Sequence, residues 1–113
     1  MLKRNKDIIA SQTVLLTKPH QLAHGLMFHK PIHDVAYIFV LGKPRYAAIH
    51  MLFVFFPIDV LWLDESKKII ALKEDAKPFA AHIDPKVHAS YIIELPALTI
   101  KKKKIKKGEK INF

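Results

Sequence analysis

The chain has no cysteine among its 113 residues, which excludes disulfides, thiolate metal sites and a cysteine nucleophile. Glycine is scarce too. The three glycines are isolated from one another, so no loop can cradle a phosphate through consecutive backbone N–H groups. None of the serines has the flanking glycines of a nucleophile elbow. The sequence therefore predicts no catalytic residue and no cofactor, and it leaves enzymatic activity undecided.

Arginine is rare in a chain whose formal net charge is +9, because lysine supplies 17 of the 19 basic residues. Base and phosphate recognition favours arginine for its planar, two-pronged guanidinium group. An excess of lysine instead suits a solvated surface, or a non-specific attraction to polyanions.

No long hydrophobic segment is free of polar residues. The longest apolar run, residues 47–63, contains His50, Pro57 and Asp59, whereas a membrane-spanning helix needs about 20 apolar residues without a central charge. Two consecutive buried strands explain this run better. The basic start, Met1 to Lys6, is followed by a segment that is too short and too polar for a signal-peptide core, so we expect a cytoplasmic protein.

The remaining pattern predicts one domain over residues 1–113, with a flexible basic N-terminus at residues 1–7. Short stretches rich in branched and aromatic residues alternate with turn residues, which predicts a mainly β fold, a sandwich or barrel with one or two short helices. Thr17 and Gly25 are placed to begin and end the first helix. The expected strands are residues 8–16, 35–41, 48–56, 58–63, 68–73, 90–95 and 110–113, and the second helix is residues 97–104.

Several short motifs occur in a fixed order along most of the chain. They are Gly25-Leu26-Met27-Phe28, His50-Met51, Pro57-Ile58-Asp59, Leu63-Asp64, Glu74 with Lys77-Pro78, Ser90-Tyr91 to Leu95-Pro96-Ala97, and Gly108-Glu109-Lys110-Ile111. The ordered set resembles the family called domain of unknown function 192, or uncharacterised protein family 0127, in its archaeal branch. The resemblance implies a jelly-roll-like β-sandwich or barrel with small helices. It implies no established activity.

Two departures from the family pattern are visible. Bacterial members of that family carry a polar stretch where this chain has Leu52, Phe53 and Val54, and many members have glycine where it has Leu98. Bacterial members also often carry a signal peptide, and the sequence predicts none here, so we expect an internal location for this protein.

Asp59 is the most conspicuous polar residue, because it interrupts apolar sequence. A carboxylate buried there must be hydrogen-bonded or protonated. One interpretation makes Asp59 a ligand-binding or acid/base group with His50 as its partner. The other makes it an acceptor of backbone N–H groups at a strand corner. With His24 from the nearby helix, His50 and Asp59 form the predicted ligand-binding set. The leading interpretation is a non-enzymatic ligand-binding or accessory module with a pocket near Asp59, for an unidentified small ligand or protein.

Histidine pairs suggest a metal-dependent hydrolase as an alternative. His20 and His24 are four residues apart, as are His29 and His33, and this spacing can hold zinc on a helix. However, Gly25 should end the helix between the two pairs, and no Glu lies between His20 and His24. The sequence therefore predicts no metal ligand.

Lysines crowd the C-terminal region and suggest a nucleic-acid accessory protein, an alternative that ranks ahead of the hydrolase. This basic face would bind the phosphates of nucleic acid without reading bases, because it lacks arginine and interleaved aromatic residues. The plainer interpretation is a charged surface facing water. The residues of the lysine face are Lys101, Lys102, Lys103, Lys104, Lys106, Lys107 and Lys110.

Overall fold

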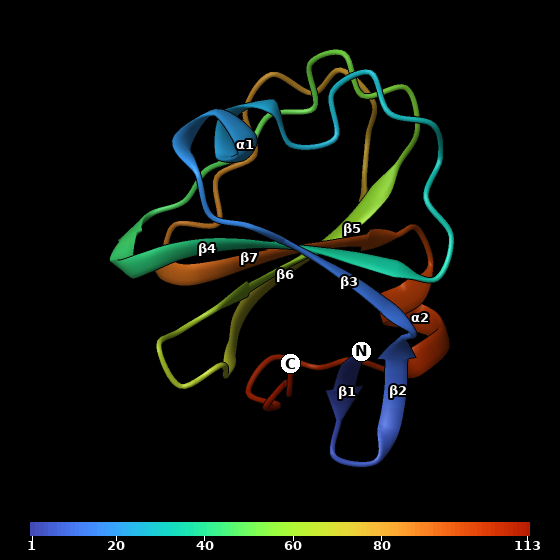
Figure 1. Ribbon diagram of the computed structural model, residues 1–113, viewed down its shortest axis with the longest axis vertical. Helices are drawn as coiled ribbons and strands as arrows, with labels where there is room; N and C mark the ends of the chain where they lie inside the picture. The colour runs from blue at the N-terminus through green and yellow to red at the C-terminus, as the bar shows by residue number, and fades with distance from the viewer.

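Seven strands and two short helices make up the computed structural model, which describes the backbone of residues 1–113 and all side chains except those at positions 19 and 23. The prediction of a mainly β fold with one or two short helices is confirmed (Figure 1). The elements are β1 (Leu2–Arg4), β2 (Asp7–Ala10), β3 (Gln12–Leu16), α1 (Pro19–His24), β4 (Val35–Tyr46), β5 (Ile58–Leu63), β6 (Ile69–Ala76), β7 (His88–Pro96) and α2 (Thr99–Lys103).

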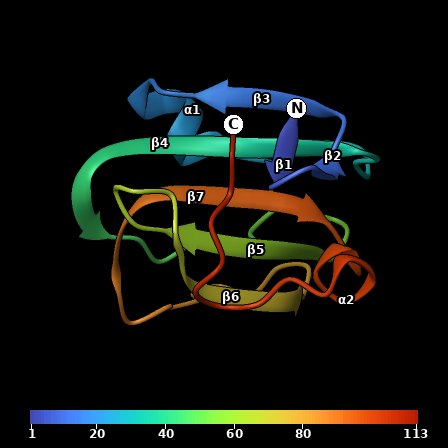
Figure 2. The same cartoon turned by 90° about the horizontal axis from the view of Figure 1, so that it is seen from below.

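A five-stranded sheet in the order β3-β4-β7-β5-β6 crosses the molecule, and β1 and β2 form a separate hairpin (Figure 2). Strands β3 and β4 run parallel, whereas the other neighbours in the sheet are antiparallel. The sheet is strongly twisted, as the chirality of L-residues requires. The hairpin, α2 and both chain ends lie below it in Figure 1, and α1 and the long loops lie above it.

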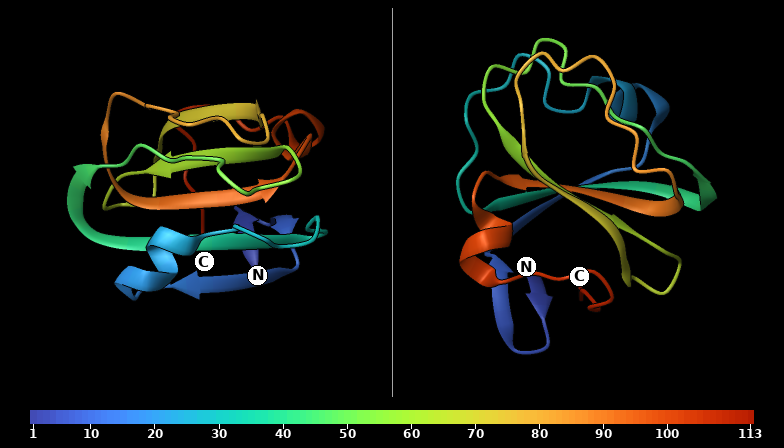
Figure 3. Two further views of the ribbon diagram at one scale, coloured as in Figure 1. Left: turned by 90° about the horizontal axis from the view of Figure 1, so that it is seen from above. Right: turned by 180° about the vertical axis from the view of Figure 1, so that it is seen from behind.

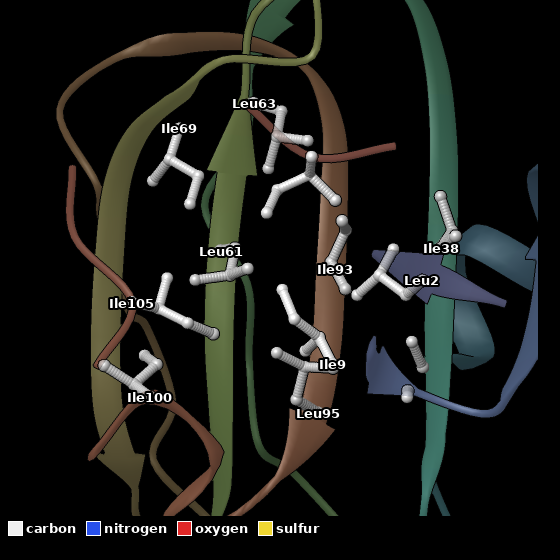
Figure 4. Close-up of a cluster of buried hydrophobic side chains, with 13 residues drawn as sticks. Leu2, Ile9, Ile38, Leu61, Leu63, Ile69, Ile93, Leu95, Ile100 and Ile105 are labelled. Carbon is white, nitrogen blue, oxygen red and sulfur yellow. The ribbon is translucent and has the colours of Figure 1, made fainter. Parts of the chain in front are cut away.

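Both faces of the sheet are covered, so the protein has two apolar cores. Figure 4 shows the core beneath the sheet, where Leu2 and Ile9 of the hairpin meet Leu61 of β5 and Ile93 of β7. The other core lies between the sheet and the loops after β4 and β6, which arch over it (Figure 3). Because side chains alternate between the faces of a strand, each central strand contributes to both cores.

Strand β5 is the part of the apolar run that was correctly predicted as a strand. It lies between β7 and β6, and all six of its side chains are buried. Val60 and Trp62 face the loops, and Leu61 and Leu63 face the hairpin. A strand buried on both faces has a nearly continuous apolar sequence rather than an alternating one. The Trp62 indole Nε1 donates to the Ala47 carbonyl at 2.7 Å, which ties the preceding loop to the sheet.

The first half of that run is not a strand, and the prediction for residues 48–56 was wrong. The segment is irregular, and a turn places Phe53 at φ 58°. Its backbone groups bond to the loop after β6 rather than to the sheet, since Met51 N–H donates to the Ala80 carbonyl and Phe79 N–H to the Met51 carbonyl. The apolar residues belong to a loop that covers the core on this face of the sheet, and Met51 and Val54 point into that core. Across the described residues, no helix has the length and apolar character needed to cross a bilayer.

The chain ends also differ from the prediction. Residues 1–7, expected to be flexible, include β1, whose Leu2 is fully buried. Residues 8–16 fall into two strands, because the chain turns at Ser11 between the hairpin and the sheet. The last residues form single bridges instead of a strand, with Lys110 opposite Lys68 and Asn112 opposite Lys3. The bridge between Lys3 and Asn112 joins the two ends of the chain, and local sequence reveals neither pairing.

The helix boundaries were predicted more closely. Gly25 ends α1 as expected, with φ 51° and its N–H donating to the Gln21 carbonyl at 2.9 Å. The N-cap is Lys18 rather than Thr17, and the Gln21 side chain accepts from the backbone N–H groups of both. Strand β4 continues to Tyr46, beyond the predicted end at residue 41, and its pairing with β7 is irregular between Val40 and Arg45.

Candidate functional site

A cavity of about 460 Å³ lies on the loop side of the sheet. Its floor comes from β4 and β7, one wall from the end of α1, and another from the loop after β4. The lining is mainly apolar and includes Leu26, Met27, Phe39, Ile49 and Ile92. An apolar cavity with a few polar groups is the usual form of a small-molecule site.

Glu94 is the one acidic residue in this lining. It is 6 % exposed, and its Oε1 atom has no hydrogen-bond partner among the residues whose side chains the structure describes. Burial raises the pKa of the Glu94 carboxyl from its ordinary 4.5 to about 8, because a charge is poorly solvated among apolar groups. Near neutral pH the free protein therefore holds Glu94 mostly in its protonated form.

The position of Glu94 follows from the period of β7. Ile93 and Leu95 enter the core beneath the sheet, so Glu94 and Ile92 point to the opposite face. Glu94 pairs with Tyr37 of β4 on one side and with Val60 of β5 on the other, at the centre of the sheet. The sequence analysis missed it. The available signal was a single charged residue within an apolar strand, the same signal that drew attention to Asp59.

Two of the three predicted ligand-binding residues, His24 and His50, line the cavity. His24 is exposed at the end of α1. His50 is half-buried in the loop after β4, and its Nδ1 accepts from the Leu52 N–H at 3.2 Å. Arg45 and Tyr46, which the sequence analysis did not select, also line the cavity from the exposed end of β4.

Asp59 is separated from this site. It is 1 % exposed, and its carboxylate accepts the backbone N–H of Asp75 at 2.9 Å and of Ile100 at 2.8 Å. Ile100 belongs to the core beneath the sheet, so Asp59 and His50 lie on opposite sides of the sheet. The structure agrees with the interpretation of Asp59 as an acceptor of backbone N–H groups.

The histidines come together differently from the predicted pairs. The rings of His24 and His29 lie 6.0 Å apart between centroids, and both line a second cavity of about 340 Å³ together with His20. Partial burial and the neighbouring His24 lower the pKa of His29. Within the described side chains, no three His, Cys, Asp or Glu groups converge as metal ligands would. The metal-dependent hydrolase therefore gains no geometric support.

The lysine face occupies α2 and the segment after it. Six of its seven lysines are exposed, and Lys103 is half-buried. Arg4, at the end of β1, stabilises this region. Its guanidinium donates to the carbonyls of Lys103 and Lys104 and pairs with Glu109 at 3.0 Å.

Comparison with known proteins decides the family. The family model DUF192, described as an uncharacterized ACR, matches residues 2–113. The chain belongs to this family. A UPF0127 protein of Thermococcus kodakarensis is 34 % identical over 90 residues, which cover 79 % of this chain and 56 % of that relative. A UPF0127 protein of Pyrococcus horikoshii is 36 % identical over 91 residues, covering 80 % of this chain and 77 % of the relative. The chain thus spans little more than half the length of the Thermococcus relative.

Two solved structures share the fold of this DUF192 member. A crystal structure from Sinorhizobium meliloti, described as a proposed transcription regulator, has a TM-score of 0.84 and 27 % identity, and the match covers 88 % of this chain and 79 % of that one. A protein of unknown function from Novosphingobium aromaticivorans has a TM-score of 0.84 at 19 % identity, and the match covers 89 % of this chain and 74 % of that one. The family and the fold are therefore established, and no activity comes with them.

Proposed function

We propose that this protein is a small-ligand-binding module whose site is the cavity around Glu94. The observation that supports the proposal is a buried carboxyl facing an apolar cavity without a hydrogen-bond partner among the described residues. An unpartnered buried polar group costs about 1–3 kcal/mol. A bound ligand that supplies the partner recovers this free energy, which gives the site a reason to bind. The cytoplasmic location expected from the sequence stays part of the proposal, and cell fractionation tests it.

The test is to fill the cavity and measure what no longer binds. Ala48 is half-buried in the lining, so Ala48→Trp places an indole in the cavity, whereas Ala81→Trp adds the same side chain at an exposed position elsewhere. Small molecules that co-purify with the natively isolated protein are identified by mass spectrometry, and a panel of charged and neutral aromatic fragments is screened by NMR. We expect bound molecules in the wild type and in Ala81→Trp, but not in Ala48→Trp. Binding that is absent throughout, or equal in all three proteins, contradicts the proposal.

A second candidate function is non-specific nucleic-acid binding by the lysine face. The exposure of six lysines at one end of the molecule supports it, and so does the description of the Sinorhizobium relative as a proposed transcription regulator. Such binding weakens steeply with salt, because each neutralised phosphate releases condensed counterions. The expected slope of log affinity against log salt concentration is about −0.9 for each phosphate contacted on duplex DNA.

Matched triple variants separate this face from the general positive charge. One variant changes exposed lysines of the face, and the control changes exposed lysines outside it, so both lose the same three charges. The face variant should lower the slope for a 20-base-pair duplex by about 3, since one counterion contact is lost per lysine. Equal slopes for both variants, or no binding at 50 mM salt, would contradict the candidate. The face variant is Lys101→Gln, Lys102→Gln and Lys104→Gln, and the control is Lys18→Gln, Lys43→Gln and Lys86→Gln.

A further inference from the structure

The space beside Gly25 is bounded by an aromatic ring and a carboxyl oxygen. A Cβ atom placed on Gly25 would lie 3.4 Å from Cζ of Phe39 and 3.9 Å from Oε1 of Glu94. Glycine has no such atom, so this space belongs to the cavity that all three residues line. A ligand group entering it contacts a π-system and a hydrogen-bond acceptor together.

Other charged and titratable groups face the cavity, but none pairs with Glu94. The basic groups come from α1, from β4 and from the loop after β4, and the tyrosines come from β4. The Nδ1 atom of His50 accepts a hydrogen bond from Leu52 N–H. Among the described residues, no hydrogen bond reaches Glu94 Oε1. The groups in question are His24, Arg45 and His50, with Tyr46 in the lining and Tyr37 beside Glu94 across the sheet.

We infer that the ligand carries a primary ammonium group on an apolar body, with the ammonium between the Glu94 carboxylate and the Phe39 ring. This inference rests on the proposed function and names the chemistry of its ligand. An ammonium group donates charge-assisted hydrogen bonds to a carboxylate, and these are about twice as strong as neutral ones. The Phe39 ring adds an apolar contact, and a cation that lies over the face of such a ring gains about 0.5–2 kcal/mol more. The apolar body would replace water along Leu26 and Ile92.

Other ligand classes fit this space less well. A carboxylate or phosphate could accept a hydrogen bond from the protonated Glu94 carboxyl, but it would gain no ion pair and would meet a like charge once that carboxyl ionises. A neutral alcohol would satisfy one hydrogen bond without gaining an ion pair. The chain's net charge of +9 repels small cations at long range, so a preference for ammonium ligands would report the site and not the overall charge.

Three matched probes test the inference: benzylammonium, benzyl alcohol and benzoate, titrated into the protein at pH 7.5 and followed by NMR. We expect benzylammonium to bind at least ~10-fold more tightly than the alcohol, as a charge-assisted bond predicts, and benzoate to bind worst. The isosteric Glu94→Gln variant should remove the preference for benzylammonium. Phe39→Leu, which keeps an apolar side chain but lacks the ring, should weaken benzylammonium more than the alcohol.

Proton release gives an independent readout. In the free protein Glu94 is mostly protonated at pH 7, because burial raises its pKa to about 8. Pairing with an ammonium ligand favours the charged carboxylate, so the proton passes to the buffer. Calorimetry in two buffers of different ionisation enthalpy should show the release of up to one proton in the wild type and none in Glu94→Gln.

The outcomes separate the two proposals. If none of the three probes binds, the ammonium inference is overturned, and the cavity function is decided separately by the co-purifying molecules and the fragment panel. If the alcohol binds as tightly as benzylammonium, and the binding is lost in Ala48→Trp, the cavity function holds and the ammonium inference is overturned. A preference for benzylammonium that persists in Glu94→Gln also overturns the inference, because another group must then recognise the cation.

Discussion

Replacing Glu94 with glutamine should make the protein more stable, and increasingly so as the pH rises. The folded-state pKa of Glu94 lies above its ordinary value, near 8 instead of 4.5. Below pH 4.5 the carboxyl is protonated in both the folded and the unfolded chain, so its titration costs nothing. Between pH 4.5 and 8 only the unfolded chain ionises, and stability falls by about 1.36 kcal/mol per pH unit. Above pH 8 both states are ionised, and the loss levels off.

The raised pKa corresponds to about 5 kcal/mol across the whole window, at 1.36 kcal/mol for each pH unit. This is an upper value, since water entering the cavity would reduce it. The assay is urea denaturation of the wild type and of Glu94→Gln from pH 5 to pH 9. Glutamine has nearly the same shape and does not titrate, and the other ionisable groups cancel in the difference. A difference in unfolding free energy that stays constant with pH would refute a buried, unpaired Glu94 carboxyl.

Further predictions concern residues that hold the fold around the site. Asp59→Asn should lower the unfolding free energy, measured in urea, by about 1.5–3 kcal/mol, because one buried backbone N–H loses a charged acceptor. Probe binding should be unchanged. The exposed Glu65→Gln is the control, and an equal effect from both variants would contradict this role of Asp59. Arg4→Met should lower the unfolding free energy by about 1–3 kcal/mol and increase hydrogen exchange of the α2 amides, since Arg4 donates to the Lys103 and Lys104 carbonyls and to Glu109. Unchanged exchange in α2 would contradict this expectation. Gly25→Ala should lower the unfolding free energy by about 1–3 kcal/mol, because φ 51° strains alanine. It should also weaken benzylammonium binding, because the added Cβ would contact the Phe39 ring. An unchanged melting temperature and affinity would contradict both expectations.

Local patterns predicted those elements whose structure depends on local chemistry. Strand β5 was evident from an apolar run bounded by Pro57 and Asp64, and the end of α1 from Gly25. Of the two interpretations of Asp59, the one based on backbone hydrogen bonds agrees with the structure, although its donors, Asp75 and Ile100, are distant in sequence and could not be named from the local pattern.

The elements that sequence reasoning missed depend on distant partners. The segment at residues 48–56 is as apolar as a buried strand. Its hydrogen bonds to the loop after β6, rather than to the sheet, make it a loop that covers the core on that face. Leu2 and Arg4 order the N-terminus through contacts with the opposite end of the chain. Glu94 stands out in the sequence as a charged residue in an apolar strand, but its place beside a cavity follows only from the central position of that strand in the sheet.

The most direct test is an NMR titration of the Glu94 side-chain carboxyl carbon, with and without saturating benzylammonium. We expect a titration midpoint near pH 8 in the free protein, and a midpoint shifted to lower pH when the cation is bound. A midpoint near the ordinary value of 4.5 that does not move with benzylammonium would show that Glu94 is solvated and that the cavity holds no carboxyl to pair with a ligand.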